Sequence, residues 1–338
     1  MNFCHVLYGL TISSNIPLPG VSIRSTIERP DVRIRLKEWK PEFQPSRPNS
    51  PNNCLYISPD NDEGGQPALR VEMLADGLHF VFFYSDGARF AVSRNGSEVW
   101  AAWPENYTLE DACTYLVGPV IAFALRLRGV TCLHGSAVAV DGRAIVLFGL
   151  AGAGKSTTAA AFALSGYPVL TDDVAVLDDH GGQFSVQPGY PRINLWPDSV
   201  QTLFRSKDVL PAITTTWDKR YMMLDQDGRR FQPKALPLGA IYILSEREPD
   251  LAAPAVEDLA GCEAFMTLVG NTYVNYLLDD DMREREFDVL SRILAGVPVR
   301  CVRPTADPSK VFALCEIIAS DARRLAARNS TNTIFAPN

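Results

Sequence analysis

The chain has 338 residues, of which 46% are hydrophobic and 21% are charged. This length is typical of about two domains, and a chain of this composition can bury a core, which excludes wholesale disorder. The formal net charge is -7, and no block of Lys and Arg stands out. A nucleic-acid backbone is therefore not expected as the main partner.

Cysteines and apolar runs indicate the compartment. Seven cysteines are scattered along the chain without a CxxC pair, which suits reduced thiols in a cytoplasm better than a disulfide framework. The N-terminus lacks the basic start and apolar run of a signal peptide, and the longest apolar run, Leu116 to Leu125, is too short to span a bilayer. We expect a cytoplasmic protein with no membrane partner.

Residues 1–107 are predicted to form a β-rich N-terminal domain, a candidate for binding substrate. Segments rich in strand-forming residues, such as Leu78 to Phe83, are separated by turn signals such as Asn95-Gly96. Pro, Asn, Asp and Gly are frequent from Pro41 to Pro67, which predicts a long loop there.

The rest of the chain is predicted to be an α/β catalytic domain, residues 108–322, followed by a loose tail, residues 323–338. Its first helix is expected to begin after Thr108, whose hydroxyl can cap it, to kink at Pro119 and to end at Gly129. The domain boundary is placed just before this helix.

A hairpin with Asp141-Gly142 as its tight turn is predicted over residues 136–148. It leads into GLAGAGKS, residues 149–156, and a helix is expected from Ser156 to Leu164. GxxxxGK[ST] between a strand and a helix predicts a phosphate-binding loop, because glycines let backbone N–H groups converge on phosphate oxygens at a helix N-terminus. The alternative is a glycine-rich turn without a ligand.

Two residues of this loop and two aspartates carry the expected chemistry. Lys155 is expected to reach the terminal phosphates, and the Ser156 hydroxyl to ligate Mg²⁺, which prefers oxygen. Asp172 and Asp173 follow the next apolar strand, where ligands gather in open α/β sheets. One carboxylate there can hold Mg²⁺ while the other accepts a proton from an attacking hydroxyl. A polar strand end without chemistry is the alternative.

His134, just before the hairpin, is a further candidate, because a histidine there can orient an aspartate or neutralise phosphate charge. A lone histidine is more often structural. Cys132 and His134 lack the neighbouring ligands that a metal site needs, so that site is rejected. The later pair Asp178-Asp179 is interpreted as part of a turn.

The run LHGSAVAVDGRAIVLFGLAGAGKSTTAAAFALSGYPVLTDDVAVL, residues 133–177, resembles the core of HPr kinase/phosphorylase. That family has the same succession of His-Gly, hairpin, phosphate loop, helix, glycine and a strand ending in Asp-Asp. The resemblance implies an α/β P-loop kinase core related to phosphoenolpyruvate carboxykinase. It also implies ATP and Mg²⁺ as cofactors and a serine hydroxyl of the phosphocarrier protein HPr as acceptor.

Carried over by position, the resemblance implies catalytic roles for His134, Lys155 and Asp172, with Asp172 taking the hydroxyl proton. Ser156 and Asp173 are the implied metal residues. The residues implied to bind ATP are Gly149, Leu150, Ala151, Gly152, Ala153, Gly154, Lys155, Ser156 and Thr157.

The chain also departs from the family. Leu150 and Ala151 replace the usual Asp and Ser of the loop, and Thr157 replaces an acidic residue. The family's Glu-x-Arg-Gly segment, which supplies a metal ligand, has no counterpart at residues 191–198. Its candidate substitutes are Arg192, Asn194 and Asp198.

The N-terminal YGLTISSNIPLPGV and the segment from Asn271 to Leu277 are more similar to HPr-kinase-like proteins that phosphorylate lasso-peptide precursors. The favoured hypothesis is a kinase for a serine of a peptide or small protein. A kinase for a small-metabolite hydroxyl and a non-catalytic ATP-binding regulatory module remain open, as does a homo-oligomer. The basic residues that either meet an acidic peptide or form a solvated surface are Lys219, Arg220, Arg229 and Arg230.

Overall fold

The computed structural model describes residues 2–24, 29–44 and 53–334, with side chains as far as residue 328. It is a mixed α/β protein that divides into two compact units. The first unit comprises Met1–Val130 and Val274–Arg283, and the second comprises Thr131–Tyr273 and Glu284–Asn338. The division falls after Val130 and not, as predicted, before Thr108. Every helix in the described ranges is too short or too polar to cross a membrane.

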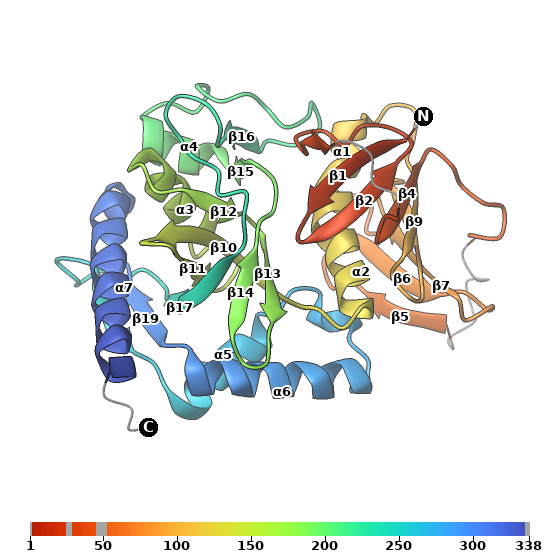
Figure 1. Ribbon diagram of the computed structural model, residues 1–338. Coiled ribbons are helices and arrows are strands. Elements are labelled where there is room, and N and C mark those ends of the chain that lie inside the picture. The colour runs from red at the N-terminus through yellow and green to blue at the C-terminus, as the bar shows by residue number, and fades with distance from the viewer. Residues whose placement is uncertain (1, 25–28, 45–52, 335–338) are drawn as a thin grey trace. The chain divides into compact units, whose positions relative to one another are not determined.

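Within the described residues, the first unit has a nine-stranded sheet in the order β3-β1-β2-β4-β9-β8-β7-β6-β5 (Figure 1). The long loop predicted from Pro41 to Pro67 is interrupted by β5, which pairs with β6, whereas residues 45–52 lie outside the described ranges. The strands are β1 (Phe3–Leu7), β2 (Leu10–Ser14), β3 (Ile23–Arg24), β4 (Val32–Leu36), β5 (Cys54–Ile57), β6 (Leu69–Met73), β7 (His79–Tyr84), β8 (Arg89–Ser93) and β9 (Glu98–Ala102).

Three helical segments pack on this sheet: α1 (Leu109–Tyr115), the π-helical turn η2 (Leu116–Val120) and α2 (Ile121–Leu127). The predicted cap is confirmed, since Thr108 and Asp111 form a capping box. The predicted kink is also confirmed, because Pro119 lies inside η2. Phe123 of α2 packs edge-on against Phe80, with ring centroids 5.0 Å apart. This packing explains why the helices belong to the first unit.

The second unit has a sheet in the order β11-β10-β13-β14-β17-β19-β18, with β12 on β10 and a further pairing of β11 with β17. The predicted hairpin is confirmed, with positive φ at Asp141 and Gly142 in its turn. A separate hairpin consists of β15 (Arg192–Leu195) and β16 (Arg220–Met223). The other strands are β10 (Thr131–Val140), β11 (Arg143–Phe148), β12 (Val169–Thr171), β13 (Val174–Asp179), β14 (Phe184–Gln187), β17 (Leu236–Leu244), β18 (Ala255–Asp258) and β19 (Val299–Arg303).

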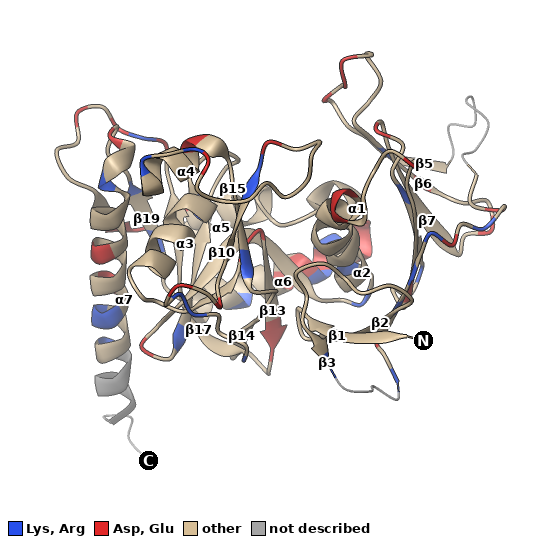
Figure 2. Ribbon diagram, turned by 90° about the horizontal axis from the view of Figure 1, so that it is seen from above, with Lys and Arg blue, Asp and Glu red and all other residues tan. Residues whose placement is uncertain are grey.

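Helices cover both faces of this second sheet (Figure 1). Successive side chains of β11 alternate, so that Ile145 and Leu147 face one core while Val146 and Phe148 face the other. The first core is closed by α3 (Lys155–Leu164) and α7 (Val311–Ile334), and the second by α5 (Gly261–Gly270) and α6 (Asp280–Gly296). The short helices are α4 (Pro197–Phe204), η3 (Asn275–Leu277) and η4 (Pro308–Lys310). Charged residues lie mostly in loops, at strand ends and on helices (Figure 2).

Most of the predicted loose tail is helical, because α7 continues to Ile334. A buried ion pair anchors α7 to the sheet, because the Arg300 guanidinium donates to both carboxylate oxygens of Asp321 at 3.0 Å. The Tyr242 hydroxyl donates to the same carboxylate at 3.0 Å, and burial raises the pKa of Tyr242 well above its usual range. Residues 335–338 lie outside the described ranges.

Removing one partner of this buried network is expected to be costly. Asp321→Ala should lower the free energy of unfolding by roughly 3–5 kcal/mol, because Arg300 and Tyr242 stay buried without it. Glu316→Ala, at an exposed position of the same helix, should change stability by less than about 0.5 kcal/mol. Urea unfolding of both variants checks this, and equal losses would show that the network does not anchor the helix.

Gly96 should tolerate no side chain. Its φ is +66°, and a Cβ there would lie 2.4 Å from the Ala124 carbonyl oxygen, whereas Gly129 has φ +79° and open space around it. Gly129→Ala should cost about 1–2 kcal/mol from backbone conformation alone, and Gly96→Ala about 1–3 kcal/mol more from the clash. Thermal and urea unfolding compare the two variants, and similar losses would contradict the clash.

Candidate active site

The glycine-rich loop joins β11 to α3, in the order that the sequence predicts. Gly149 has a φ of 141°, and a Cβ there would lie 2.7 Å from the carbonyl oxygen of Leu244 at the end of β17. Only glycine therefore lets the loop start against that neighbouring strand. The first bond within α3 runs from the Thr158 N–H to the Gly154 carbonyl, at 2.8 Å. The N–H groups ahead of it have no partner within the helix, an arrangement that favours anions.

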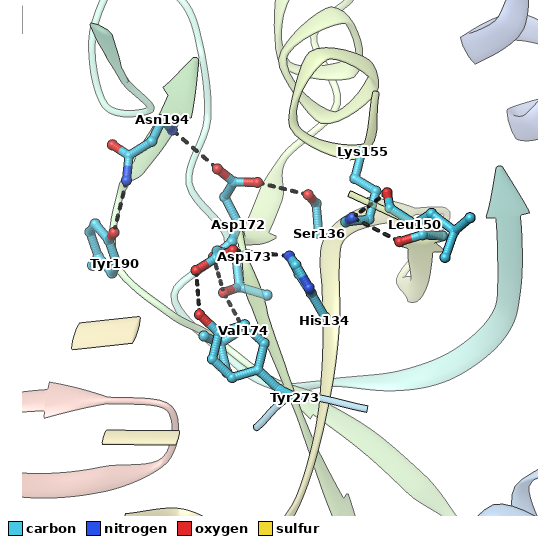
Figure 3. A network of polar contacts seen from close by, with 12 residues as sticks. His134, Ser136, Leu150, Lys155, Asp172, Asp173, Val174, Tyr190, Asn194 and Tyr273 are labelled. Carbon is cyan, nitrogen blue, oxygen red and sulfur yellow. Dashed lines mark hydrogen bonds and ion pairs between the residues drawn. The ribbon is translucent and has the colours of Figure 1, made fainter. Parts of the chain in front are cut away.

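Lys155 is buried and folds over its own loop. Its Nζ donates to the carbonyl oxygens of Gly149 at 2.8 Å and Leu150 at 3.0 Å (Figure 3). Burial lowers the pKa of Lys155, and the charges of Asp173 and Asp172 oppose that shift. The ammonium group is thus held at the loop by two neutral acceptors that an anion can replace.

Asp172 and Asp173 form the corner between β12 and β13. The Val174 N–H donates to the Asp172 carbonyl at 2.9 Å, and Asp173 takes a φ of +71°. The Gly135 N–H of β10 donates to the Asp173 carbonyl at 3.1 Å, which ties the corner to the central strand. The left-handed conformation at Asp173 turns the two adjacent side chains into different surroundings.

Asp172 is buried among donors. Its Oδ1 accepts a 2.7 Å hydrogen bond from the Ser136 hydroxyl, and its Oδ2 accepts one of 3.1 Å from the Asn194 N–H. Ser156 of α3 lies close enough to this carboxylate to lower its pKa. Burial raises the pKa of Asp172, the charge of Asp173 adds to that effect, and these three neighbours reduce it.

Asp173 is more open, with 45% of its side chain exposed. Its Oδ1 lies 3.3 Å from His134 Nε2, and its Oδ2 accepts a 2.7 Å hydrogen bond from the Tyr273 hydroxyl. The His134 and Tyr273 rings meet edge-on, with centroids 5.2 Å apart. Surrounding protein raises the pKa of Asp173, but His134, the Tyr273 hydrogen bond and the charge of Lys219 outweigh this and hold it below the usual value.

Some of the residues predicted to act in the site lie beside the two aspartates, and others lie elsewhere in the fold. His134 lies within β10 and contacts Asp173, Ser156 contacts Asp172, and Thr157 shares a 2.8 Å hydrogen bond with Ser199. Asp198, a candidate substitute for the missing glutamate, pairs instead with Lys207 in solvent. Asp178 and Asp179 are not part of a turn, as predicted, but end strand β13, where Asp179 pairs with Arg292.

Three residues at the site were not among the sequence candidates for its chemistry: Ser136, Asn194 as a partner of Asp172, and Tyr273. Ser136 had a detectable signal, because it and His134 are polar residues two positions apart in an apolar strand and so share a face. Tyr273 had none, since it is 100 positions from Asp173 in the sequence.

The site's donor chemistry suits Mg²⁺. No group of three or more His, Cys, Asp or Glu side chains that could hold a metal occurs in the described part of the chain. Mg²⁺ needs no such cage, because it commonly binds one or two carboxylates together with water and substrate phosphates. The Ser156 hydroxyl and the Asp172 carboxylate offer adjacent oxygens of this kind.

The raised pKa of Asp172 predicts a stability cost at neutral pH. A carboxyl whose pKa is higher in the folded than in the unfolded protein binds its proton more tightly when folded. Its contribution to folding stability is therefore lost as pH rises through the folded pKa. Asp172→Asn should therefore be more stable than the wild type at pH 7, since an amide can still bond Ser136 and the Asn194 N–H. The difference should shrink toward pH 4, where carboxyls ordinarily titrate. Thermal unfolding across that range checks this, and a variant less stable at pH 7 would contradict it.

Comparison with known proteins gives a distant structural relationship. No family model and no curated protein sequence matches the chain. Among solved structures, the chain is similar to the HPr(Ser) kinase/phosphatase from Coxiella burnetii, with a TM-score of 0.33 and 13% sequence identity. The match covers 61% of this chain and 99% of the other. Likeness of this degree carries no argument about activity, which has to come from the site itself.

Proposed function

We propose that this protein is an ATP- and Mg²⁺-dependent kinase with a P-loop core that phosphorylates a serine hydroxyl of a peptide or small protein. The observation that carries the proposal is the juxtaposition of a GxxxxGKS loop with two adjacent carboxylates in unlike environments. One carboxylate is buried near the serine that ends the loop, and the other is open and paired with a histidine.

The loop would hold the nucleotide. Its N–H groups and the N-terminus of α3 receive phosphate oxygens, and Lys155 exchanges its bonds to the Gly149 and Leu150 carbonyls for the phosphates. Ser156 would hold Mg²⁺, with the Asp172 carboxylate supporting that site. When bound, Mg²⁺ neutralises the charge on the β- and γ-phosphates.

The two aspartates are proposed to take roles opposite to those that the family resemblance implies. Both oxygens of Asp172 are occupied by donors and the residue is 6% exposed, so an acceptor hydroxyl has little access to it. Asp173 is open, and its lowered pKa keeps it ionised at neutral pH. Asp173 is therefore proposed as the proton acceptor, and Asp172 as the carboxylate that supports the Mg²⁺ site.

In the proposed step, the γ-phosphate moves from ATP to the serine oxygen. The serine oxygen forms a bond to the γ-phosphorus while the bond from that phosphorus to the bridging oxygen breaks, releasing ADP. The hydroxyl proton passes to Asp173. His134 and Tyr273 orient this carboxylate through its two oxygens. Phosphoryl transfer of this kind depends mainly on positioning and on electrostatic stabilisation.

Two variants separate the proposed roles. Asp173→Asn should lower the transfer rate to a serine peptide library by about 10²–10⁴-fold, the range for a general base, with ATP affinity unchanged. Asp172→Asn should weaken Mg²⁺-dependent ATP binding. Calorimetry with MgATP and mass spectrometry of the library measure the two effects. The reverse pattern would restore the implied roles, and tight ATP binding without transfer would favour a regulatory module.

Lys155→Met tests the loop itself. It should remove ATP binding, because the ammonium group that faces the phosphates is lost while the side-chain volume is kept. Lys207→Met, at an exposed lysine paired with Asp198, is the matched control and should bind ATP as the wild type does. ATP binding that survives in Lys155→Met would contradict the loop as the nucleotide site.

A further inference from the structure

The hairpin of β15 and β16 presents one polar face beside the carboxylate corner. In its register Ile193 lies opposite Met222, and both are fully buried in the core. Residues opposite each other share a face and neighbours along a strand alternate, so Asn194 and Tyr221 lie on the other face. Trp196 directly follows β15, and Lys219 directly precedes β16.

Side-chain contacts join the polar residues of the hairpin into two groups. Lys219 Nζ lies 5.0 Å from the centre of the Trp196 ring, and the Arg192 guanidinium lies 4.7 Å from the Tyr221 ring. Arg192 also donates to the Asn194 side-chain oxygen at 3.0 Å. We call these five residues the hairpin face: Arg192, Asn194, Trp196, Lys219 and Tyr221.

The hairpin face adjoins the carboxylate corner. The Asn194 backbone N–H bonds Asp172, and the charge of Lys219 acts on Asp173. Figure 3 shows Asn194 and Lys155 on opposite sides of Asp172. The cations of the hairpin face are thus placed for a molecule that binds beside the aspartates.

Neither cation of this face forms an ion pair among the described residues, although the charge of Lys219 acts on Asp173. Aromatic rings hold both Lys219 and Arg192 in place. The other basic residues singled out in the sequence have partners: Arg229 pairs with Asp227, Arg220 donates to the Asp218 carbonyl, and Arg230 donates to the Gly166 carbonyl. Trp196 is 55% exposed, which is unusual for so large a ring.

We propose that the hairpin face binds the phosphate acceptor and selects peptides with a carboxylate side chain close to the phosphorylated serine. The proposal rests on the proposed kinase function. Two preoriented, unpaired cations complement a carboxylate, and the exposed Trp196 ring offers an apolar surface to the peptide. The serine bound beside this face would reach Asp173, while the nucleotide would lie at the loop beyond Asp172.

A positional-scanning library of serine peptides tests the selection. Each position within four residues of a fixed serine carries Glu, Gln, Lys or Ala in turn, and transfer from MgATP is measured by mass spectrometry. Glu should be preferred over Gln by about tenfold in kcat/KM at one or more positions, the size expected of one charge-assisted hydrogen bond. The preference should fall as salt is raised, because the cations are partly exposed.

Lys219→Gln should remove most of this preference by raising KM for the acidic peptide, with the KM for ATP unchanged. Lys207→Gln, at an exposed lysine outside the hairpin face, should keep the preference. Three results would overturn the inference: equal transfer to Glu and Gln peptides, a preference that survives in Lys219→Gln, or a Lys219→Gln defect in ATP affinity alone. Calorimetry of the wild type with MgATP is a separate test. Failure to bind ATP would contradict the proposed kinase function, whereas the peptide results test only the selection of acidic peptides.

Discussion

The site depends on holding two adjacent carboxylates in unlike environments. Neighbouring aspartates repel each other when both are ionised. The left-handed turn at Asp173 sends one side chain inward, to Ser136 and Asn194, and the other outward, to His134 and Tyr273. Opposite pKa shifts follow from this arrangement, upward for the buried group and downward for the open one. Each aspartate can then do a different task at one pH.

The surrounding fold supplies what this corner requires. β10 carries Ser136 and His134 on one face, and its Gly135 N–H holds the corner in place. β17 lies against the start of the glycine loop so closely that a side chain at Gly149 would clash with it. The sheet is fixed in turn by two apolar cores and by the buried bond of α7 to Arg300. Burying a charged Asp172 opposes folding, and this large packed frame offsets that cost.

The arrangement also separates two kinds of ligand. On one side of Asp172 lie the loop, Lys155 and Ser156, which suit phosphates. Beside the same corner lies the hairpin face, whose cations Arg192 and Lys219 form no ion pair among the described residues. In the proposed transfer, the corner would lie between the nucleotide and the acceptor, since phosphoryl transfer needs the two held in line. The proposed reaction is the one that the resemblance to HPr kinase/phosphorylase implies, although the proposed roles of the aspartates differ.

The sequence by itself determined the local elements, because their signals are short-range. The Asp141-Gly142 turn, the Thr108 cap, the Pro119 kink and the strand–loop–helix around Lys155 all depend on residues close together in the chain. The long-range features were decided only by the tertiary structure. Nothing local indicates that α2 packs on the first sheet, that α7 continues into the predicted tail, or that Tyr273 meets Asp173. Asn194 and Lys219 flank the aspartates only because the hairpin register brings them there, and register is set by burial of Ile193 and Met222 in a core that exists only in the folded chain.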